Sequence, residues 1–384
     1  MKFATRAVQS SIETGGTTGD VSPPIHLSSI YAYDAPGEMR AGYEYIRYGN
    51  PTRALLERCI ADLENAPEEC PALCFSSGMA AIDCVTRLLR PGDHLLISRD
   101  VYGGTTRLAN TLLKPAGILF SEADATDAGR FLEAVQPATR MVWLETPSNP
   151  LVRLTDIAAV SAGAHSRGAL VAVDSTFASP CFQNPLDLGA DIVMHSATKY
   201  LGGHSDLLGG ALVVRDAELR SRLNEIQMIG GAVLSPFDCW LTLRGIRTLD
   251  VRMRAHEQRA TAVAGFLAAH PAIARVHYPG LEDHPQRELA RRQMRGYGGM
   301  LAAELKGGRE AAVAALGRTK IFTLAASLGG VESIISYPPL MSHAAMSPEE
   351  RYARGITDGL VRLSIGLEHP DDLIADLDRA LAGG

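Results

Sequence analysis

The sequence has no long uninterrupted hydrophobic run. No stretch approaches the ~20 apolar residues that a membrane-spanning helix needs, so we expect no membrane partner. Residues Met1 to Arg6 also lack an apolar run of signal-peptide length. With 46% hydrophobic and 21% charged residues, the composition is typical of a globular protein. We therefore expect a cytoplasmic location.

The sequence also lacks a large excess of either positive or negative charge. The 37 Lys and Arg residues and 43 Asp and Glu residues give a formal net charge of -6, and the arginines are dispersed along the chain. Binding to nucleic acid or to an anionic membrane needs a concentrated positive field. The sequence therefore predicts neither as a partner.

Paired cysteines and metal-ligand patterns are missing too. Cys70 and Cys74 are too widely spaced for a CxxC pair, and no HxxxH partner lies nearby. His195, His204 and Asp206 match no usual ligand spacing, so we expect loop roles for them and no metal. The cysteines lie mostly in apolar segments, which predicts buried free thiols and suits a reducing compartment. They are Cys59, Cys70, Cys74, Cys84, Cys181 and Cys239.

From about residue 52 onward, short apolar runs alternate with helix-length connections. This alternation predicts an α/β fold with a seven-stranded, mostly parallel sheet and helices on both faces. The seven expected strands are 72–76, 94–98, 118–121, 141–145, 170–174, 192–195 and 211–214. In such a sheet, ligands bind at the carboxyl ends of the strands.

The two ends of the chain have a different character. The first 51 residues are rich in Gly, Pro, Ser, Thr and Tyr with little periodicity, which predicts an extended arm that crosses to another subunit. After residue 245 the pattern changes to a long charged helix at 248–270 and strand-like runs at 275–278 and 300–305. We therefore expect three parts, which are an arm at 1–51, a large domain at 52–246 and a smaller α+β domain at 247–384.

Lys199 carries the most specific functional signal. It stands in a polar loop after an apolar strand, 25 residues beyond Asp174 at the end of the preceding strand. A lysine that is desolvated and kept near neutral can form an imine with the aldehyde of pyridoxal 5'-phosphate (PLP). Asp174 would pair with the pyridinium nitrogen and keep the ring an electron sink. An isolated lysine is more often a solvated surface charge, but this context favours a covalent anchor.

A phosphate site is expected beside that lysine. A strand, a small-residue turn and a helix that begins near Ala80 would direct the backbone amides of Gly78 and Met79 at one phosphate group. Ser196 and Thr198, which flank Lys199, would add hydroxyls. Alone, a glycine in a strand-to-helix turn is more often structural.

Two polar side chains near other strand ends extend the predicted site. Tyr102 follows the second strand, where its ring could stack on a flat cofactor and its phenol could relay protons, although packing is the more common role of a loop tyrosine. Asn149 ends the fourth strand and could bond to the phenolic oxygen of the cofactor, or simply form a turn before proline.

Arginines at both ends of the chain suit anionic groups. Tyr45 and Arg47 would point to one side of an extended arm, which suits the phosphate in a site shared across a dimer interface. Arg362 stands among apolar neighbours, where it would bind a substrate α-carboxylate or form a structural ion pair.

Seven motifs are spread along the chain. They are SSGMA at 76–80, YGGT at 102–105, ETPSNP at 145–150, DSTF at 174–177, SATKY at 196–200, SLGGVES at 327–333 and RLSIGLE at 362–368. Taken together, they resemble the Cys/Met metabolism family of PLP-dependent enzymes, which includes cystathionine γ-synthase, γ-lyase and β-lyase. The resemblance covers essentially the whole chain and implies a fold-type-I PLP enzyme, usually a tetramer of two catalytic dimers.

The resemblance also implies residue roles. Lys199 is similar to the Schiff-base lysine and proton shuttle, and Tyr102 to the stacking ring. Arg362 resembles the arginine that binds the substrate carboxylate, with Asn149 and Ser327 in the same cavity. The cofactor is implied to be held by Asp174 at its ring nitrogen and, at its phosphate, by Gly78, Met79, Ser196 and Thr198 with Tyr45 and Arg47 of the neighbouring subunit.

The expected activity is a carbon–sulfur lyase acting on cystathionine or a related sulfur L-amino acid by β- or γ-elimination. One alternative is γ-replacement that joins an O-acylhomoserine to cysteine, and another is a PLP-binding protein without turnover. Ala326 stands where many γ-synthases and γ-lyases carry a glutamate, and Gly104 where methionine γ-lyases carry a cysteine. The sequence therefore leaves the subfamily open.

Overall fold

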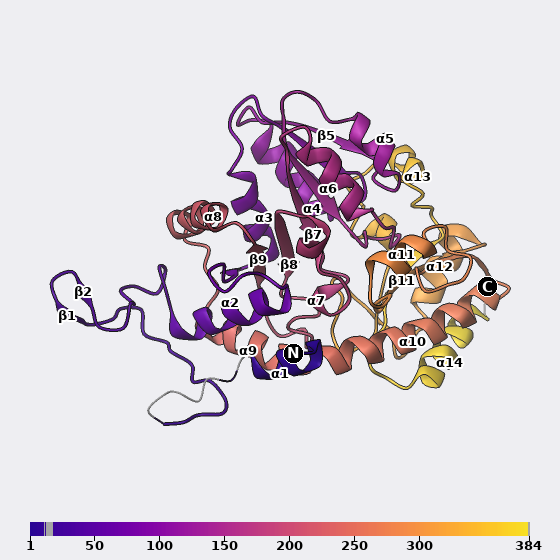
Figure 1. Ribbon diagram of the computed structural model, residues 1–384. Helices are drawn as coiled ribbons and strands as arrows, with labels where there is room; N and C mark the ends of the chain where they lie inside the picture. The colour runs from indigo at the N-terminus through magenta and orange to yellow at the C-terminus, as the bar shows by residue number, and fades with distance from the viewer. Residues whose placement is uncertain (11, 13–17, 383–384) are drawn as a thin grey trace.

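The largest element of the computed structural model, which describes residues 1–10, 12 and 18–382, is a seven-stranded sheet (Figure 1). Its order is β3-β9-β8-β7-β6-β4-β5, and every neighbouring pair is parallel except the two that contain β9. The predicted mostly parallel sheet is confirmed, with strand ends that differ by at most two residues from those expected. The strands are β3 (Leu73–Phe75), β4 (His94–Ser98), β5 (Leu119–Ala123), β6 (Thr139–Glu145), β7 (Leu170–Asp174), β8 (Ile192–Ser196) and β9 (Gly210–Val214).

Helices bury both faces of this sheet. In β4, Leu95 and Ile97 pack with α3 and α8 on one face, whereas Leu96 packs with α5 and α6 on the other. Successive side chains of a strand point to opposite faces, so burial on both sides explains why the strands are continuous apolar runs. The helices of this part are α2 (Pro51–Leu63), α3 (Gly78–Thr86), α4 (Gly103–Leu108), the π-helix Ala109–Leu113, α5 (Ala128–Glu133), α6 (Ile157–His165), α7 (Ser179–Phe182), the 3-10 helix Pro185–Leu188, α8 (Ala217–Gly230) and α9 (Pro236–Ile246).

A second sheet of five strands follows, in the order β10-β11-β14-β13-β12. Its pairs are antiparallel except β12 with β13. The strands are β10 (Ile273–His277), β11 (Met300–Leu305), β12 (Thr323–Leu324), β13 (Ile334–Ser336) and β14 (Leu360–Ser364). The remaining helices are α10 (Leu249–Ala269), α11 (Arg287–Gln293), α12 (Gly308–Leu316), the 3-10 helix Pro338–Leu340, α13 (Pro348–Ala353) and α14 (Pro370–Leu381).

The long helix α10 joins the two parts. Leu249 and Met253, near its start, belong to the core beside the large sheet, whereas Val263 and Leu267 belong to the core of the second sheet. The helix predicted over 248–270 is therefore confirmed, while the domain boundaries proposed at 51 and 246 stay predictions. Among the residues that the structure describes, no helix is both long enough and apolar enough to cross a bilayer.

The N-terminal segment departs from expectation at its start. Instead of an extended arm, residues Phe3–Gln9 form α1, which packs against α2 and α10 and buries Ala7. A short helix is stabilised by tertiary packing rather than by its own propensity, so the weak sequence pattern did not reveal it. The glycine-rich stretch at 15–17 lies outside the described residues. The chain next passes α9, where Pro23 O accepts from Trp240 Nε1 at 3.0 Å. It then projects from the rest of the molecule at β1 (Tyr33–Ala35) and β2 (Glu38–Met39), at the left of Figure 1.

Four neighbouring strands end at the same edge of the large sheet. β4, β6, β7 and β8 are parallel, and their last residues are Ser98, Glu145, Asp174 and Ser196. Polar side chains therefore gather at this edge, as the topology of a parallel sheet predicts.

Candidate active site

A cavity of about 660 Å³ lies at this edge, between the large sheet and loops of the second sheet. Eleven of the thirteen predicted site residues line it, and the other two, Tyr45 and Arg47, do not. The eleven are Gly78, Met79, Tyr102, Asn149, Asp174, Ser196, Thr198, Lys199, Ala326, Ser327 and Arg362.

Lys199 projects from the turn that follows β8. Its amide donates to Ser196 O at 3.2 Å and its carbonyl accepts from Gly203 N at 2.7 Å, which fixes the turn. Its Nζ donates a hydrogen bond to Ser327 Oγ. Burial and, to a lesser extent, the nearby Arg362 cation lower the pKa of Lys199 to about 8, while Asp174 opposes the shift. The site thus holds an amine that is partly neutral near physiological pH.

Asp174, at the end of β7, is buried in the same cavity. Its Oδ1 accepts from Thr176 N at 3.0 Å. Burial raises the pKa of Asp174, while Thr176, His195 and Lys199 act in the opposite direction. A cationic group bound in the cavity beside this carboxyl would favour its ionised form, because an opposite charge lowers the pKa of a carboxyl. The carboxyl is suited to a protonated ring nitrogen.

The turn between β3 and α3 provides a cradle for an anion. The helix begins at Gly78, two residues before the predicted start, and Ser77 Oγ caps it by accepting from Ala80 N at 3.1 Å. The first amides of a helix have no partner within it, and Gly78 and Met79 line the cavity. A Cβ at position 78 would stand 2.9 Å from Met194 Cε and 3.3 Å from Ser196 Oγ, so a larger residue would displace the Met194 side chain and crowd Ser196.

Arg362, on β14, also lines the cavity and is buried. Its NH1 donates to Asn149 Oδ1 at 2.9 Å and its NH2 to Ser327 O at 2.7 Å. These are amide and carbonyl oxygens, so the structural ion pair considered for Arg362 does not appear among the described residues. Nε is buried there without a hydrogen-bond partner. Burial lowers the pKa of Arg362 only to about 10, which leaves it charged and able to bind a carboxylate.

Asn149 lies four residues beyond the end of β6, rather than at the end of the strand as expected. It is buried, and its side-chain oxygen is engaged by Arg362. Tyr102 immediately precedes α4, and 48% of its surface is exposed. A Cβ at Gly104 would lie 2.3 Å from Tyr102 Cε1, so the ring folds directly over that glycine.

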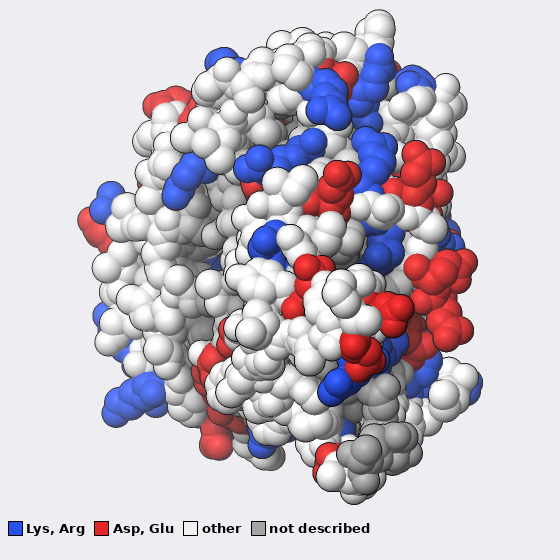
Figure 2. All heavy atoms as spheres, turned by 90° about the vertical axis from the view of Figure 1, so that its left-hand side faces the viewer, with Lys and Arg blue, Asp and Glu red and all other residues white. Residues whose placement is uncertain are grey.

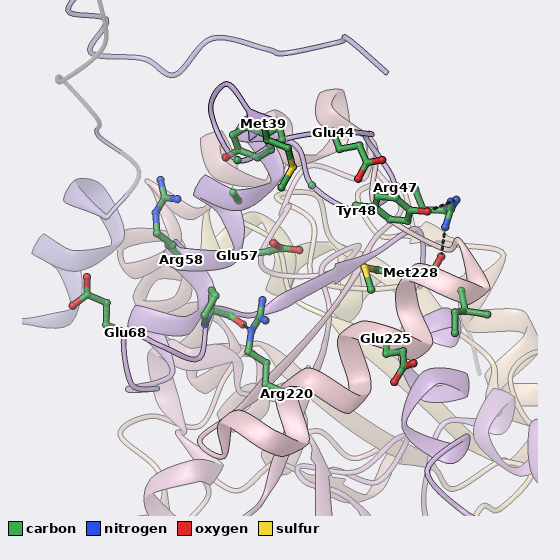
Figure 3. Close-up of a pocket in the computed structure, with 16 residues that line it drawn as sticks. Met39, Glu44, Arg47, Tyr48, Glu57, Arg58, Glu68, Arg220, Glu225 and Met228 are labelled. Atoms are coloured by element: carbon green, nitrogen blue, oxygen red, sulfur yellow. Dashed lines mark hydrogen bonds between the residues drawn. The ribbon is translucent and has the colours of Figure 1, made fainter. Parts of the chain in front are cut away.

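Tyr45 and Arg47 lie outside this cavity. Arg47 lines a second cavity, of about 810 Å³ (Figure 3). Arg47 NH1 donates to Met228 O at 2.8 Å, and its guanidinium stands 4.6 Å from the centre of the Tyr48 ring. Neither residue reaches the Lys199 cavity of its own chain. Their expected contribution to the site of a neighbouring subunit stays a prediction.

The loop role expected for His195 is wrong, because the residue lies in the strand that was also expected at 192–195. His195 lies on β8, is buried, and its Nε2 is 2.6 Å from the equally buried Glu64 Oε1. Among the described residues, no group of three or more His, Cys, Asp or Glu side chains could hold a metal ion. All six cysteines are free and buried, which confirms that prediction.

Sequence reasoning missed Glu145, Thr176, Ser336, Met341 and Ser342, all of which line the cavity. Glu145 could have been found, because it ends the strand beside β7 and pairs with Asp174 in register.

The residues present fit PLP. One end of the cavity offers the glycine cradle and the Ser196 hydroxyl for a phosphate, Asp174 suits a ring nitrogen, and Lys199 supplies an amine of lowered pKa for the aldehyde. The orphaned Nε of Arg362 leaves a donor for a further anion.

Comparison with known proteins agrees with this donor set. The family model described as Cys/Met metabolism PLP-dependent enzyme matches residues 4–382. The chain belongs to this family. Its cofactor is therefore PLP.

Relatives with different named activities are about equally similar to this member of the family. Cystathionine gamma-lyase of Dictyostelium discoideum is 48% identical over 380 residues, covering 99% of this chain and 97% of the relative. Cystathionine beta-lyase of Coxiella burnetii is 46% identical over 379 residues, covering 98% of this chain and 97% of the relative. The crystal structure of cystathionine gamma synthase from Xanthomonas oryzae pv. oryzae in complex with cystathionine matches with a TM-score of 0.96 and 47% identity, covering 100% of this chain and 98% of that one.

Proposed function

We propose that the protein is a carbon–sulfur lyase that acts on cystathionine or a related sulfur L-amino acid. The observation that carries this proposal is the arrangement around Ser327, which bonds through Oγ to Lys199 Nζ and through its carbonyl to Arg362. Ser327 thus holds both the residue that would act as the base and the residue that would bind the substrate carboxylate. Named lyases of this family at 46–48% identity support the choice of substrate class.

We infer that Gly78, Met79, Ser196 and Thr198 bind the phosphate of PLP and that Asp174 binds its ring nitrogen. Bound PLP supplies an electron sink that stabilises negative charge at the α-carbon of the substrate. The chain supplies everything else that orients the reaction.

Arg362, with Asn149 beside it, would bind the α-carboxylate of the amino acid. This places the α-carbon toward Lys199, whose neutral Nζ accepts the α-proton. A pKa of about 8 suits that task, because the amine is neutral often enough to act as a base and still returns the proton afterwards.

Tyr102 would complete the β-elimination. The bond between the β-carbon and sulfur breaks, and the leaving thiolate takes a proton from Tyr102 Oη. With one water, the remaining three-carbon fragment gives pyruvate and ammonia. In γ-elimination, Lys199 would first give up the α-proton, and its neutral Nζ would then remove a proton from the β-carbon. The bond between the γ-carbon and sulfur breaks, the leaving thiolate is protonated, and with one water the remaining four-carbon fragment gives 2-oxobutanoate and ammonia.

γ-Replacement is the second candidate, because a γ-synthase structure is as similar as the lyases are. In that reaction an O-acylhomoserine loses its acyloxy group and the thiolate of cysteine forms the new carbon–sulfur bond. Ala326 lines the cavity where many γ-enzymes carry a glutamate, so the distal amino group of a substrate would lack that carboxylate here. This favours β-elimination over γ-elimination and γ-replacement.

The deciding experiment incubates the purified holoenzyme with cystathionine and, separately, with O-succinylhomoserine plus cysteine. Pyruvate would identify β-elimination, 2-oxobutanoate from cystathionine would identify γ-elimination, and newly formed cystathionine would identify γ-replacement. Lys199→Ala is the matched control, because it removes the base and leaves the cavity walls. Absence of any product with sulfur amino acids would refute both enzyme proposals and favour a PLP-binding protein without turnover.

We also propose a homotetramer of two catalytic dimers, in which Tyr45 and Arg47 complete the site of a neighbouring subunit. Support comes from the segment beyond residue 18, which exposes the large apolar side chains Val21, Leu27 and Ile30. Broad areas of the face seen in Figure 2, on the side where β1 and β2 lie in Figure 1, carry no charged side chain. A cytoplasmic location is supported by the six free thiols.

A further inference from the structure

Glu145 is a buried carboxyl group inside the site that has no role in the reaction described above. It is the last residue of β6, is 5% exposed, and lines the same cavity as Lys199. Removing a carboxyl group from water is costly unless its oxygens are satisfied. Its contacts therefore indicate what it does.

One oxygen of Glu145 is engaged by the main chain of Tyr102. Oε2 accepts a hydrogen bond from Tyr102 N at 2.5 Å, across 43 positions of sequence. The Glu145 amide in turn donates to Ser98 Oγ at 3.1 Å, which ties it to the end of β4. The carboxyl group is thus fixed from the sheet and reaches out to the loop that carries the tyrosine.

The ring of Tyr102 has little else to hold it. Nearly half of the residue is exposed, and no side chain caps the helix that starts after it. The main chain is bonded at the carbonyl, which accepts from Thr105 N at 2.8 Å, and at the amide, which Glu145 binds. The position of the ring therefore depends on these two bonds and on the absence of a Cβ at Gly104, over which the ring folds.

We propose that Glu145 is a positioning residue, whose side-chain oxygen holds the main chain of Tyr102 so that the aromatic ring stays over the cavity. This inference rests on the proposed function, in which Tyr102 stacks on the cofactor and protonates the leaving group. Glu145 acts through Tyr102 and need not touch the substrate.

The charges around Glu145 are compatible with this role in either protonation state. Asp174 lies opposite it on the neighbouring strand, and Asp100, Lys199 and Arg362 are the other charged groups near this part of the site. Burial and the Asp174 carboxylate raise the pKa of Glu145, and hydrogen bonds from the backbone amides of Tyr102 and Asn149 act in the opposite direction. A neutral carboxyl still offers a carbonyl oxygen to Tyr102 N, and so does the amide of glutamine.

The test compares Glu145→Gln with Glu145→Leu in wild-type and Tyr102→Ala backgrounds. We measure the dissociation constant of PLP from the apoprotein and kcat/KM with cystathionine. Gln keeps the acceptor, so both values should stay within about three-fold of wild type. Leu leaves the Tyr102 amide without its partner, and we expect PLP binding and kcat/KM to weaken about ten-fold to a hundred-fold. In the Tyr102→Ala background the Leu substitution should have almost no further effect.

Additive losses in that cycle would overturn the proposal, because they would mean that Glu145 acts independently of Tyr102. A loss beyond about ten-fold in Glu145→Gln would overturn it as well, since glutamine preserves the shape and the acceptor. Glu304→Leu is the control for loss of a partly buried carboxylate, because Glu304 bonds to His277 at 2.6 Å in the second sheet.

If Glu145→Leu does not yield folded protein, Glu145→Ser replaces it, since serine cannot reach Tyr102 and its hydroxyl tolerates water. Failure of this inference is separable from failure of the proposed function. An active enzyme with an additive cycle removes only the role of Glu145, whereas an enzyme inactive with every sulfur amino acid removes the proposed reaction.

Discussion

Ser327 Oγ accepts a hydrogen bond from Lys199 Nζ, although 128 positions separate the two residues in the chain. Ser327 has a backbone φ of 80°, in the left-handed region that costs a non-glycine residue about 1–2 kcal/mol. Its carbonyl oxygen also accepts from Arg362 NH2 at 2.7 Å. One strained residue in the loop between β12 and β13 therefore positions both the amine and the guanidinium of the site.

We predict that Ser327→Ala lowers kcat about ten-fold and leaves KM nearly unchanged. Alanine removes the acceptor for Lys199 Nζ but keeps the Cβ, the backbone geometry and the carbonyl that binds Arg362. Steady-state kinetics with cystathionine provide the measurement. A rise in KM with unchanged kcat would contradict this assignment, because it would mean that the hydroxyl serves substrate binding instead of the base.

The lowered pKa of Lys199 predicts how the apoprotein takes up its cofactor. Only the neutral amine attacks an aldehyde, and its fraction grows as the pH rises through about 8. The rate of PLP incorporation should therefore rise about ten-fold per pH unit below pH 8 and level off above it. Stopped-flow absorbance of the covalently bound cofactor gives this rate.

The Arg362 cation contributes to that lowered pKa, so Arg362→Leu should move the midpoint of the pH profile upward. A wild-type midpoint near 10.5, the ordinary value for lysine, would show that burial has little influence on this amine. A midpoint that stays near 8 in Arg362→Leu would refute only the effect of the Arg362 charge and would leave burial as the cause of the lowered pKa.

Arg362→Lys should raise the KM for the amino acid roughly 100-fold, because an ammonium cannot reproduce the two-pronged guanidinium contact and leaves its buried partners unsatisfied. The visible absorbance of the bound cofactor should be unchanged. An amine substrate analogue without the α-carboxylate is the matched probe. If the substitution raises the KM for this analogue as much as it raises the KM for the amino acid, Arg362 does not bind the carboxylate.

The sequence predicted the parts of this molecule whose signal is local. The runs that form β4 and β7 have the expected bounds because strands buried on both faces are continuously apolar. Lys199 and Asp174 could then be predicted to lie in the site, because ligands bind at the carboxyl ends of parallel strands.

Features that depend on tertiary contacts were not predictable in the same way. The helix α1 is stabilised by packing on α2 and α10 rather than by its short sequence. In the sequence, Glu145 is only the last residue of a strand. In the structure, its side chain accepts a hydrogen bond from the Tyr102 amide, 43 positions away. The place of Tyr45 and Arg47 depends on a second copy of the chain, which one sequence cannot supply.

Two glycines in helices should respond in opposite ways to the same added methyl group. At Gly104 a Cβ would meet Tyr102 Cε1 at 2.3 Å and Met79 Sδ at 2.7 Å, so the ring or the methionine must move. We expect Gly104→Ala to weaken PLP binding about ten-fold and to change the circular dichroism of the cofactor band.

At Gly265, inside α10, nothing lies within 4 Å of the added Cβ. Gly265→Ala should therefore stabilise the protein by about 0.5–1 kcal/mol, because alanine loses less backbone entropy in a helix than glycine does. Chemical denaturation of the holoenzyme measures this change, and dialysis against apoprotein measures cofactor affinity. PLP affinity should be unaffected in Gly265→Ala, which makes it the control for Gly104→Ala. If Gly104→Ala bound PLP as tightly as Gly265→Ala, the ring of Tyr102 would have room to move without loss, and its close approach to the glycine would have no role in holding the cofactor.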